Sequence, residues 1–218
     1  MSFSSLEKPL VKICGLQSLE AAEHAVNSGA KLLGIICVPN RKRTVNPAVA
    51  RQISQMVHSL DPRDVRLVGV FRNQSKEDVL QLATDYNVDI VQLHGDEPWE
   101  EYQSFLKKPI FKRMIFPEDC AHVAKLSKEP EVLCLFDSEA GGSGELLNWE
   151  SIEKWAQTDG KGSRFILAGG LTPDNVSHAL KMDGVIGVDV SGGVETDGTK
   201  DSHKVTRFLD NAYKTKQK

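Results

Sequence analysis

Four polar side chains stand at the carboxyl ends of short apolar runs, and their types are those used in acid–base chemistry. They are Cys14, His94, Asp137 and Asp189. The run Val132–Phe136 before Asp137 has the length of an inner parallel strand and is too short for a buried helix. Each polar residue would then lie at a strand tip, facing a shared pocket. A thiol and a carboxyl group placed there could act as general base and general acid.

Each of these residues also has a purely structural interpretation. Cys14 could be a small buried hydrophobe, as most free cysteines are. Asp137 could cap a helix or accept loop hydrogen bonds. Position favours a function for Cys14 and Asp137. For His94 and Asp189, a hydrogen-bonding role in the surrounding loops stays an equal alternative.

Two further features indicate an anionic ligand. One is a basic loop from Pro39 to Thr44, in which one arginine could grip a carboxylate through two parallel hydrogen bonds. Spacing does not choose between Arg41 and Arg43, and solvent exposure is the simpler interpretation of Arg41 and Lys42. The other is a set of glycine-rich loops after the last three apolar runs, whose bare amides suit a phosphate dianion. These loops are Gly141-Gly142-Ser143-Gly144, Gly169-Gly170 and Ser191-Gly192-Gly193.

The elements that would position these residues alternate between strand and helix. Eight apolar runs are predicted strands, each followed by a predicted helix: 11–14, 32–37, 67–71, 90–93, 110–116, 132–136, 165–168 and 185–190. This alternation requires parallel strands with right-handed crossovers. An open doubly wound sheet would gather its polar tips on a few strands. Here they are spread over strands one, four, six and eight, which predicts a closed (β/α)8 TIM barrel forming one domain over residues 1–218.

Composition excludes several other classes. The formal charge of −3 and the lack of a basic stripe argue against a nucleic-acid partner. No apolar stretch is long enough to predict a membrane span, and we see no secretory signal. The four cysteines form no C-x-x-C pair, which argues against a zinc site or disulfides and favours a reducing, cytoplasmic location. We expect a monomer that needs neither a metal nor another cofactor.

Taken together, these motifs resemble the phosphoribosylanthranilate isomerases of tryptophan biosynthesis, in their monofunctional form. The resemblance covers residues 11 to 195 in order and rests on Lys12-Ile13-Cys14-Gly15, Gly34-Ile35-Ile36, Pro39 to Arg43, Gly69-Val70-Phe71, Val91-Gln92-Leu93-His94-Gly95, Asp137 with Gly141 to Gly144, Ala168-Gly169-Gly170-Leu171 and Gly187 to Glu195.

The resemblance implies a reaction and a set of roles. The reaction is the Amadori rearrangement of N-(5-phosphoribosyl)anthranilate to 1-(2-carboxyphenylamino)-1-deoxyribulose 5-phosphate. It makes Cys14 the general base, Asp137 the general acid and Arg43 the residue that holds the anthranilate carboxylate. His94 and Asp189 match pocket residues, and the glycine loops match the phosphate site. Two alternatives remain: another phosphosugar isomerase on the same barrel, and a non-catalytic phosphosugar-binding barrel.

Lys12 is predicted to assist Cys14. Side chains alternate along a strand, so Lys12 would face the same way as Cys14. A thiol is a fair base near neutral pH only if its thiolate is stabilised, and a nearby ammonium group would do this.

Overall fold

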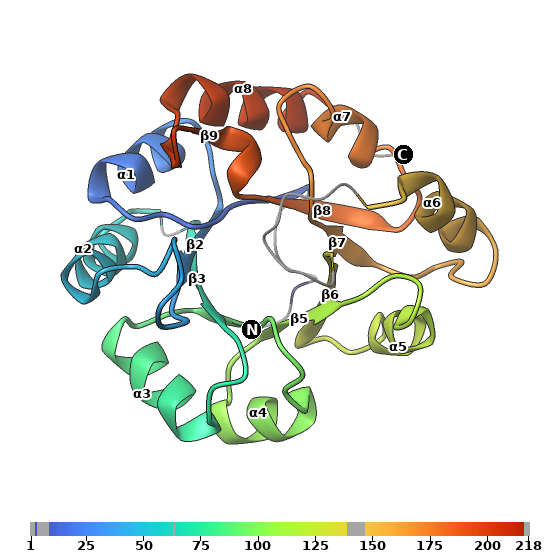
Figure 1. Cartoon of the computed structure of the whole chain (residues 1–218), viewed down its shortest axis with the longest axis horizontal. Coiled ribbons are helices and arrows are strands. Elements are labelled where there is room, and N and C mark those ends of the chain that lie inside the picture. Colours follow the sequence, from blue (N-terminus) through green and yellow to red (C-terminus); the bar gives the residue numbers. More distant parts are fainter. Residues whose placement is uncertain (1–2, 4–8, 63, 139–146, 216–218) are drawn as a thin grey trace.

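The strands close into a barrel. A computed structural model describes residues 3, 9–62, 64–138 and 147–215. Within these residues, eight parallel strands pair in chain order, and the eighth pairs with the first (Figure 1). They are β1 (Leu10–Ile13), β2 (Leu32–Ile36), β3 (Arg66–Phe71), β4 (Ile90–Leu93), β5 (Ile110–Met114), β6 (Val132–Phe136), β7 (Phe165–Leu167) and β8 (Val185–Val190). The predicted (β/α)8 barrel is confirmed, whereas the extent of the domain, 1–218, stays a prediction.

The helices form a ring around the strands (Figure 1). Their bounds are α1 (Leu19–Asn27), α2 (Pro47–His58), α3 (Lys76–Asp85), α4 (Trp99–Leu106), α5 (Cys120–Leu126), α6 (Trp149–Gln157), α7 (Val176–Ala179) and α8 (Ser202–Tyr213). Several begin at the residues that the sequence favours. The side chain of Ser18 accepts a hydrogen bond from the amide of Ala21, and Pro47 occupies the first turn of α2.

The strands are apolar because both of their faces are covered. One group of side chains packs between the strands and the helices. A second, smaller group fills the inside of the barrel and includes Leu10, Leu32, Ile90 and Phe111. Phe3 belongs to this inner group, with its ring centroid 5.1 Å from that of Phe111. The amino end of the barrel interior is therefore filled with hydrocarbon, and polar side chains gather at the opposite end.

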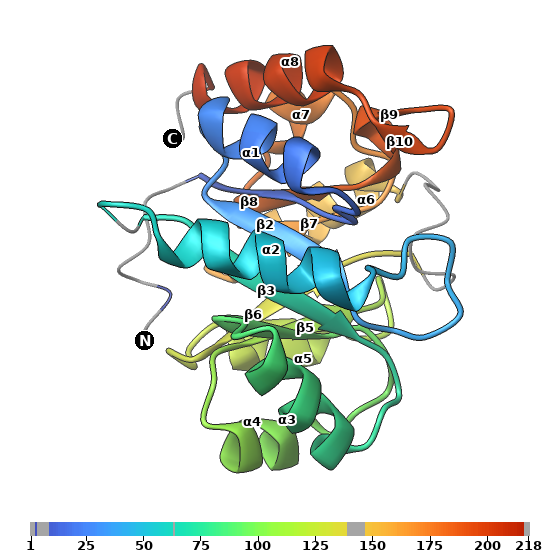
Figure 2. The same cartoon turned by 90° about the vertical axis from the view of Figure 1, so that its left-hand side faces the viewer.

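The chain after β8 contains elements that the sequence analysis did not predict. A 3-10 turn, η2 (Gly192–Val194), leads into a hairpin of β9 (Glu195–Thr196) and β10 (Thr199–Lys200). In Figure 2 the hairpin lies on the side opposite the labelled amino terminus. The two residues at its tip, Asp197 and Gly198, have φ values of 53° and 80°. Asp-Gly is a strong signal for such a turn, so the hairpin could have been predicted.

The strand bounds shift by a residue or two at several ends. The first strand ends at Ile13, so Cys14 follows it directly, although the amide of Cys14 still donates to the carbonyl of Val190 at 2.8 Å. Among the described residues, none of the helices is long and apolar enough to cross a membrane.

Candidate active site

A cavity of about 600 Å³ opens at the carboxyl ends of the strands. Its lining brings together all the predicted site residues that the structure describes: Cys14, Arg43, His94, Asp137, Gly169, Gly170, Asp189, Ser191, Gly192 and Gly193. The remaining predicted residues, Gly141, Gly142, Ser143 and Gly144, lie outside the described residues. Arg41 and Lys42 are exposed, as expected, and also line this mouth.

Cys14 lies above a buried ion pair. Lys12 is fully buried, and its Nζ lies 3.1 and 3.0 Å from the two carboxylate oxygens of Asp189. The two residues are register partners on β1 and β8, so their side chains leave the sheet side by side. Gly34 on β2 makes room for this group, because a Cβ there would lie 2.8 Å from the Cys14 sulfur and 2.9 Å from Cε of Lys12.

The protonation of Cys14 is governed chiefly by its burial. Burial raises the pKa of the Cys14 thiol, whereas the charge of Lys12 lowers it and that of Asp189 raises it again. Burial alone would lower the pKa of Lys12, but Asp189 and Cys14 outweigh this, and the pKa of Lys12 is raised. Lys12 is thus close enough to favour the thiolate, as expected. Its effect is smaller than that of burial, so the uncharged thiol predominates at neutral pH.

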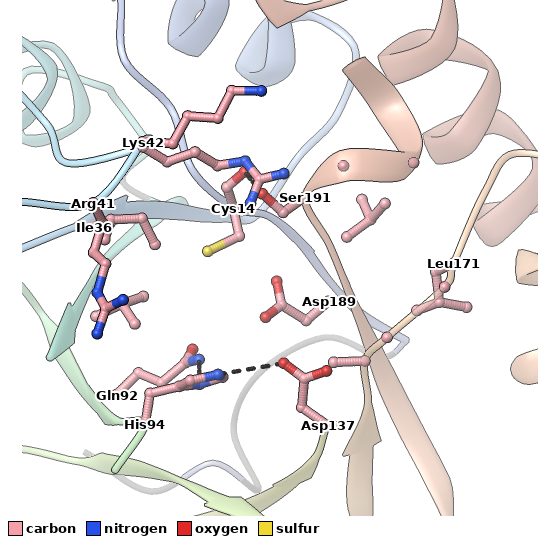
Figure 3. Close-up of a pocket in the computed structure, with 18 of the residues that line it drawn as sticks. Cys14, Ile36, Arg41, Lys42, Gln92, His94, Asp137, Leu171, Asp189 and Ser191 are labelled. Carbon is pink, nitrogen blue, oxygen red and sulfur yellow. Dashed lines mark hydrogen bonds and ion pairs between the residues drawn. The ribbon is translucent and has the colours of Figure 1, made fainter. Parts of the chain in front are cut away.

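Asp137 and His94 form a second polar group across the cavity. Nε2 of His94 lies 3.3 Å from a carboxylate oxygen of Asp137. The other ring nitrogen lies 3.1 Å from the amide nitrogen of Gln92, which places the ring proton on Nε2, facing Asp137. Figure 3 shows both contacts, with the Cys14 sulfur pointing into the cavity from the opposite side. The backbone amide of Ser138 donates to the second oxygen of Asp137 at 2.8 Å.

Gln92 leaves one acceptor for a ligand. The side chain is 1% exposed, lines the cavity, and its Oε1 has no hydrogen-bond partner among the described residues. A buried acceptor without a partner costs free energy unless a ligand or water satisfies it. The sequence analysis did not select Gln92, although the two-residue period puts it on the face of β4 continued by His94.

Arg43 belongs to a charged cluster beside the mouth. Its Nε and Nη2 donate to the two carboxylate oxygens of Glu195 at 2.9 and 3.2 Å. Lys200 donates to Oε1 of Glu195 at 2.7 Å and to the carbonyl of Ser191 at 3.0 Å. Burial would raise the pKa of Glu195, but hydrogen bonds from Arg43 and Lys200 lower it below its ordinary value. Sequence reasoning missed Lys200, because only the hairpin brings it back over Arg43.

The loops after β7 and β8 pack tightly against each other. A Cβ on Gly193 would lie 1.7 Å from the carbonyl oxygen of Leu171, so only glycine allows this approach. The hydroxyl of Ser191 donates to the carbonyl of Cys14 at 3.1 Å, which ties the β8 loop to the tip of β1. These loops place backbone amides at one edge of the cavity, in the position where many such barrels bind phosphate.

The fold and the site together define a (β/α)8-barrel enzyme with a thiol and a carboxyl group facing one cavity. The family model for N-(5'-phosphoribosyl)anthranilate isomerase matches residues 11–211. The chain is 58% identical to the N-(5'-phosphoribosyl)anthranilate isomerase of Saccharomyces cerevisiae over 98% of this chain and 99% of the relative. The chain belongs to the N-(5'-phosphoribosyl)anthranilate isomerase family.

Solved structures agree with this assignment. One is a phosphoribosyl anthranilate isomerase in complex with reduced 1-(o-carboxyphenylamino)-1-deoxyribulose 5-phosphate, at 33% identity and a TM-score of 0.77, with 94% of this chain and 98% of that chain covered. Another shows monomers generated from the dimeric enzyme of Thermotoga maritima, at 32% identity and a TM-score of 0.77, with the same coverage. The expected family, fold and aldose–ketose isomerase activity in tryptophan biosynthesis are confirmed.

Proposed function

We propose that Cys14 is the general base and Asp137 the general acid of the rearrangement of N-(5'-phosphoribosyl)anthranilate. The observation that carries this proposal is their placement: both line one cavity, from strands separated by β7 and β8 in the ring. A sugar held between them would present its ring oxygen to one group and its second carbon to the other.

The proton transfers balance with these two groups alone. Asp137, in its protonated form, gives a proton to the ring oxygen as the ring opens to an iminium ion. Cys14, as thiolate, removes the proton from the second carbon, which yields an enolamine. The Cys14 thiol then gives its proton to the first carbon, and the Asp137 carboxylate takes the proton of the hydroxyl on the second carbon. The enolamine thereby becomes the ketone, and both groups return to their starting states. Lys12 favours the thiolate by its charge. The Nε2–H of His94 donates to Asp137 and orients its carboxyl group.

The rest of the cavity suits the remote groups of the substrate. We assign the phosphate to the glycine loops after β6, β7 and β8, and the anthranilate carboxylate to Arg43. Gln92 Oε1 is placed to accept a hydrogen bond from a sugar hydroxyl. Binding energy from both ends of the substrate would hold the sugar between Cys14 and Asp137.

Complementation of a tryptophan auxotroph lacking this isomerase tests the residue roles. The wild-type chain should restore growth without tryptophan, and Cys14→Ala and Asp137→Asn should not. The matched control is Asp174→Asn, an exposed aspartate that pairs with Arg207 on the outside of the barrel. Full growth with either site variant, at wild-type protein level, would remove that residue from the mechanism.

We also propose that the enzyme acts as a monomer in the cytoplasm. The large apolar side chains exposed among the described residues are Leu80, Phe105 and Tyr213, and the Lys76 ammonium lies over the ring of Phe105. The four cysteines are free, as a reducing compartment requires. Light scattering after gel filtration tests the first point, and the mass of a dimer, as in the Thermotoga maritima relative, would refute it.

A further inference from the structure

The cluster of Arg43, Glu195 and Lys200 contains more charge than a simple ion pair needs. The side chains of Arg43 and Glu195 are 23% and 9% exposed, and that of Lys200 is 5% exposed. Glu195 and Lys200 are register partners across the hairpin, so the turn at Asp197 and Gly198 brings the two together. Burying a lysine to this extent is costly unless partners satisfy its charge, and Glu195 and the Ser191 carbonyl do so here.

The charge balance suggests a use. Arg43 and Glu195 alone would form a neutral pair, with little attraction for an anion. Lys200 bonds the same carboxylate, and the three groups together carry a net charge of +1. A guanidinium has five N–H donors, and the two bonds from Arg43 to Glu195 leave the other donors available. Arg43 can therefore be held rigidly by Glu195 and still offer both donors and positive charge to a carboxylate.

We propose that Lys200 is a positioning residue for carboxylate recognition: it offsets the charge of Glu195 and so allows Arg43 to bind the anthranilate carboxylate. Lys200 does not contact the carboxylate in this arrangement but acts through Arg43. The inference rests on the proposed role of Arg43. It adds that the selectivity for a carboxylated aromatic ring depends on the β9–β10 hairpin as well as on the loop after β2.

The test compares two ligands that differ only in this carboxylate. The first is reduced 1-(o-carboxyphenylamino)-1-deoxyribulose 5-phosphate, and the second is the same compound with an unsubstituted phenyl ring. Lys200→Met should weaken binding of the first by about tenfold or more, measured by calorimetry, because a nearby unit charge is lost. Binding of the second should change less than about twofold, and kcat with the natural substrate should change much less than KM.

Lys204→Met is the matched control. Lys204 lies on α8, and its Nζ donates to the backbone carbonyl of Glu195 at 2.8 Å. This variant therefore removes one lysine that bonds to the same hairpin without touching the Glu195 carboxylate. Both ligands should bind it as they bind the wild-type protein. Lys200→Gln keeps a donor for Ser191 but no charge, and should behave like Lys200→Met. A purely structural role would weaken both ligands equally in Lys200→Met, and that result would overturn the proposal.

Arg43→Met separates this inference from the role of Arg43 itself. If Arg43→Met weakens both ligands equally, Arg43 does not hold the carboxylate and the underlying proposal fails. If Arg43→Met discriminates between the ligands and Lys200→Met does not, only the present inference fails. If both are correct, adding Lys200→Met to Arg43→Met should cause almost no further loss of affinity, because the two residues act on one contact.

Discussion

Cys14 combines two environments that act against each other. As the proposed general base, it needs a pocket dry enough to make its thiolate a strong base, yet that same burial raises the pKa of its thiol. The Lys12–Asp189 pair beneath it moderates this effect, with the ammonium group favouring the thiolate and the carboxylate opposing it. The protonation of Cys14 is therefore set by its burial and by these two neighbouring charges.

The pH dependence of catalysis follows from this raised pKa. We expect kcat/KM to keep rising above neutral pH, because the fraction of thiolate increases about tenfold per pH unit below the thiol pKa. Cys14→Ala should lower kcat by roughly 10²–10⁴ and abolish this limb of the profile. Rates measured from pH 6 to 10, with the fold checked by circular dichroism, test both points. A Cys14→Ala enzyme that keeps more than about a tenth of the wild-type kcat would exclude Cys14 as the base.

Asp137→Asn should lower turnover and leave binding almost unchanged. The amide preserves the shape of the side chain but cannot deliver a proton to the ring oxygen. We expect kcat to fall by roughly 10²–10⁴. The affinity for the reduced product analogue should change little, because that compound is already ring-opened. A large loss of affinity with an unchanged kcat would show that Asp137 binds the substrate instead of protonating it.

Among the elements, β2 shapes the candidate active site through a position that has no side chain. Gly34 provides the space that the Cys14 sulfur and the Lys12 side chain occupy.

The strands could be predicted from sequence because their apolar runs and polar tips are local signals. The charge pairs between residues far apart in the sequence could not be predicted. Lys200 reaches the Arg43–Glu195 pair only through the hairpin, and Lys12 meets Asp189 only after β8 closes on β1. Gln92 had a local signal in its two-residue spacing from His94, and the hairpin had one in Asp197 and Gly198.

Gly34→Ala tests whether the site needs the space that Gly34 leaves for Cys14 and Lys12. A Cβ at Gly34 would lie within 3 Å of both Cys14 Sγ and Lys12 Cε, so one of them must move. Overpacking of this kind costs about 1–3 kcal/mol of stability, and we expect kcat to fall because the thiol is displaced. In a Cys14→Ala background the same substitution should have no further effect on kcat. An additional loss of kcat in that background would mean that Gly34 acts through some other group.

At the scale of the whole molecule, the interior contains a charged layer above a hydrocarbon layer. The Lys12–Asp189 pair lies within the closed barrel, on the pocket side of the inner apolar group. Such a pair contributes little net stability, but breaking it leaves a buried charge without its partner. The barrel must therefore keep both residues or neither.

Unfolding measurements test this dependence. Lys12→Met should lower the free energy of unfolding by about 3–5 kcal/mol, and adding Asp189→Asn should restore much of the loss. Arg51→Met is the control, because Arg51 pairs with Asp85 on the surface, and it should change stability little. If the double variant were as unstable as the sum of the two single variants, the charges of Lys12 and Asp189 would not be coupled.

Activity without a metal or another cofactor is a prediction about the whole protein. The proposed reaction needs one acid, one base and no change of redox state. We expect full activity after exhaustive chelation and dialysis. An activity that disappears and returns only on addition of a divalent cation would refute this expectation.

The filling of the barrel by Phe3 and Phe111 determines how molecules enter and leave. Those rings, with Leu10, Leu32 and Ile90, occupy the amino end of the interior, so within the part of the chain that the structure describes the cavity opens only at the strand tips. Product must depart through the opening that admits the next substrate, and the two cannot pass each other inside. Product inhibition should then be strictly competitive, and the ketose should leave at the strand tips rather than through a tunnel along the barrel axis.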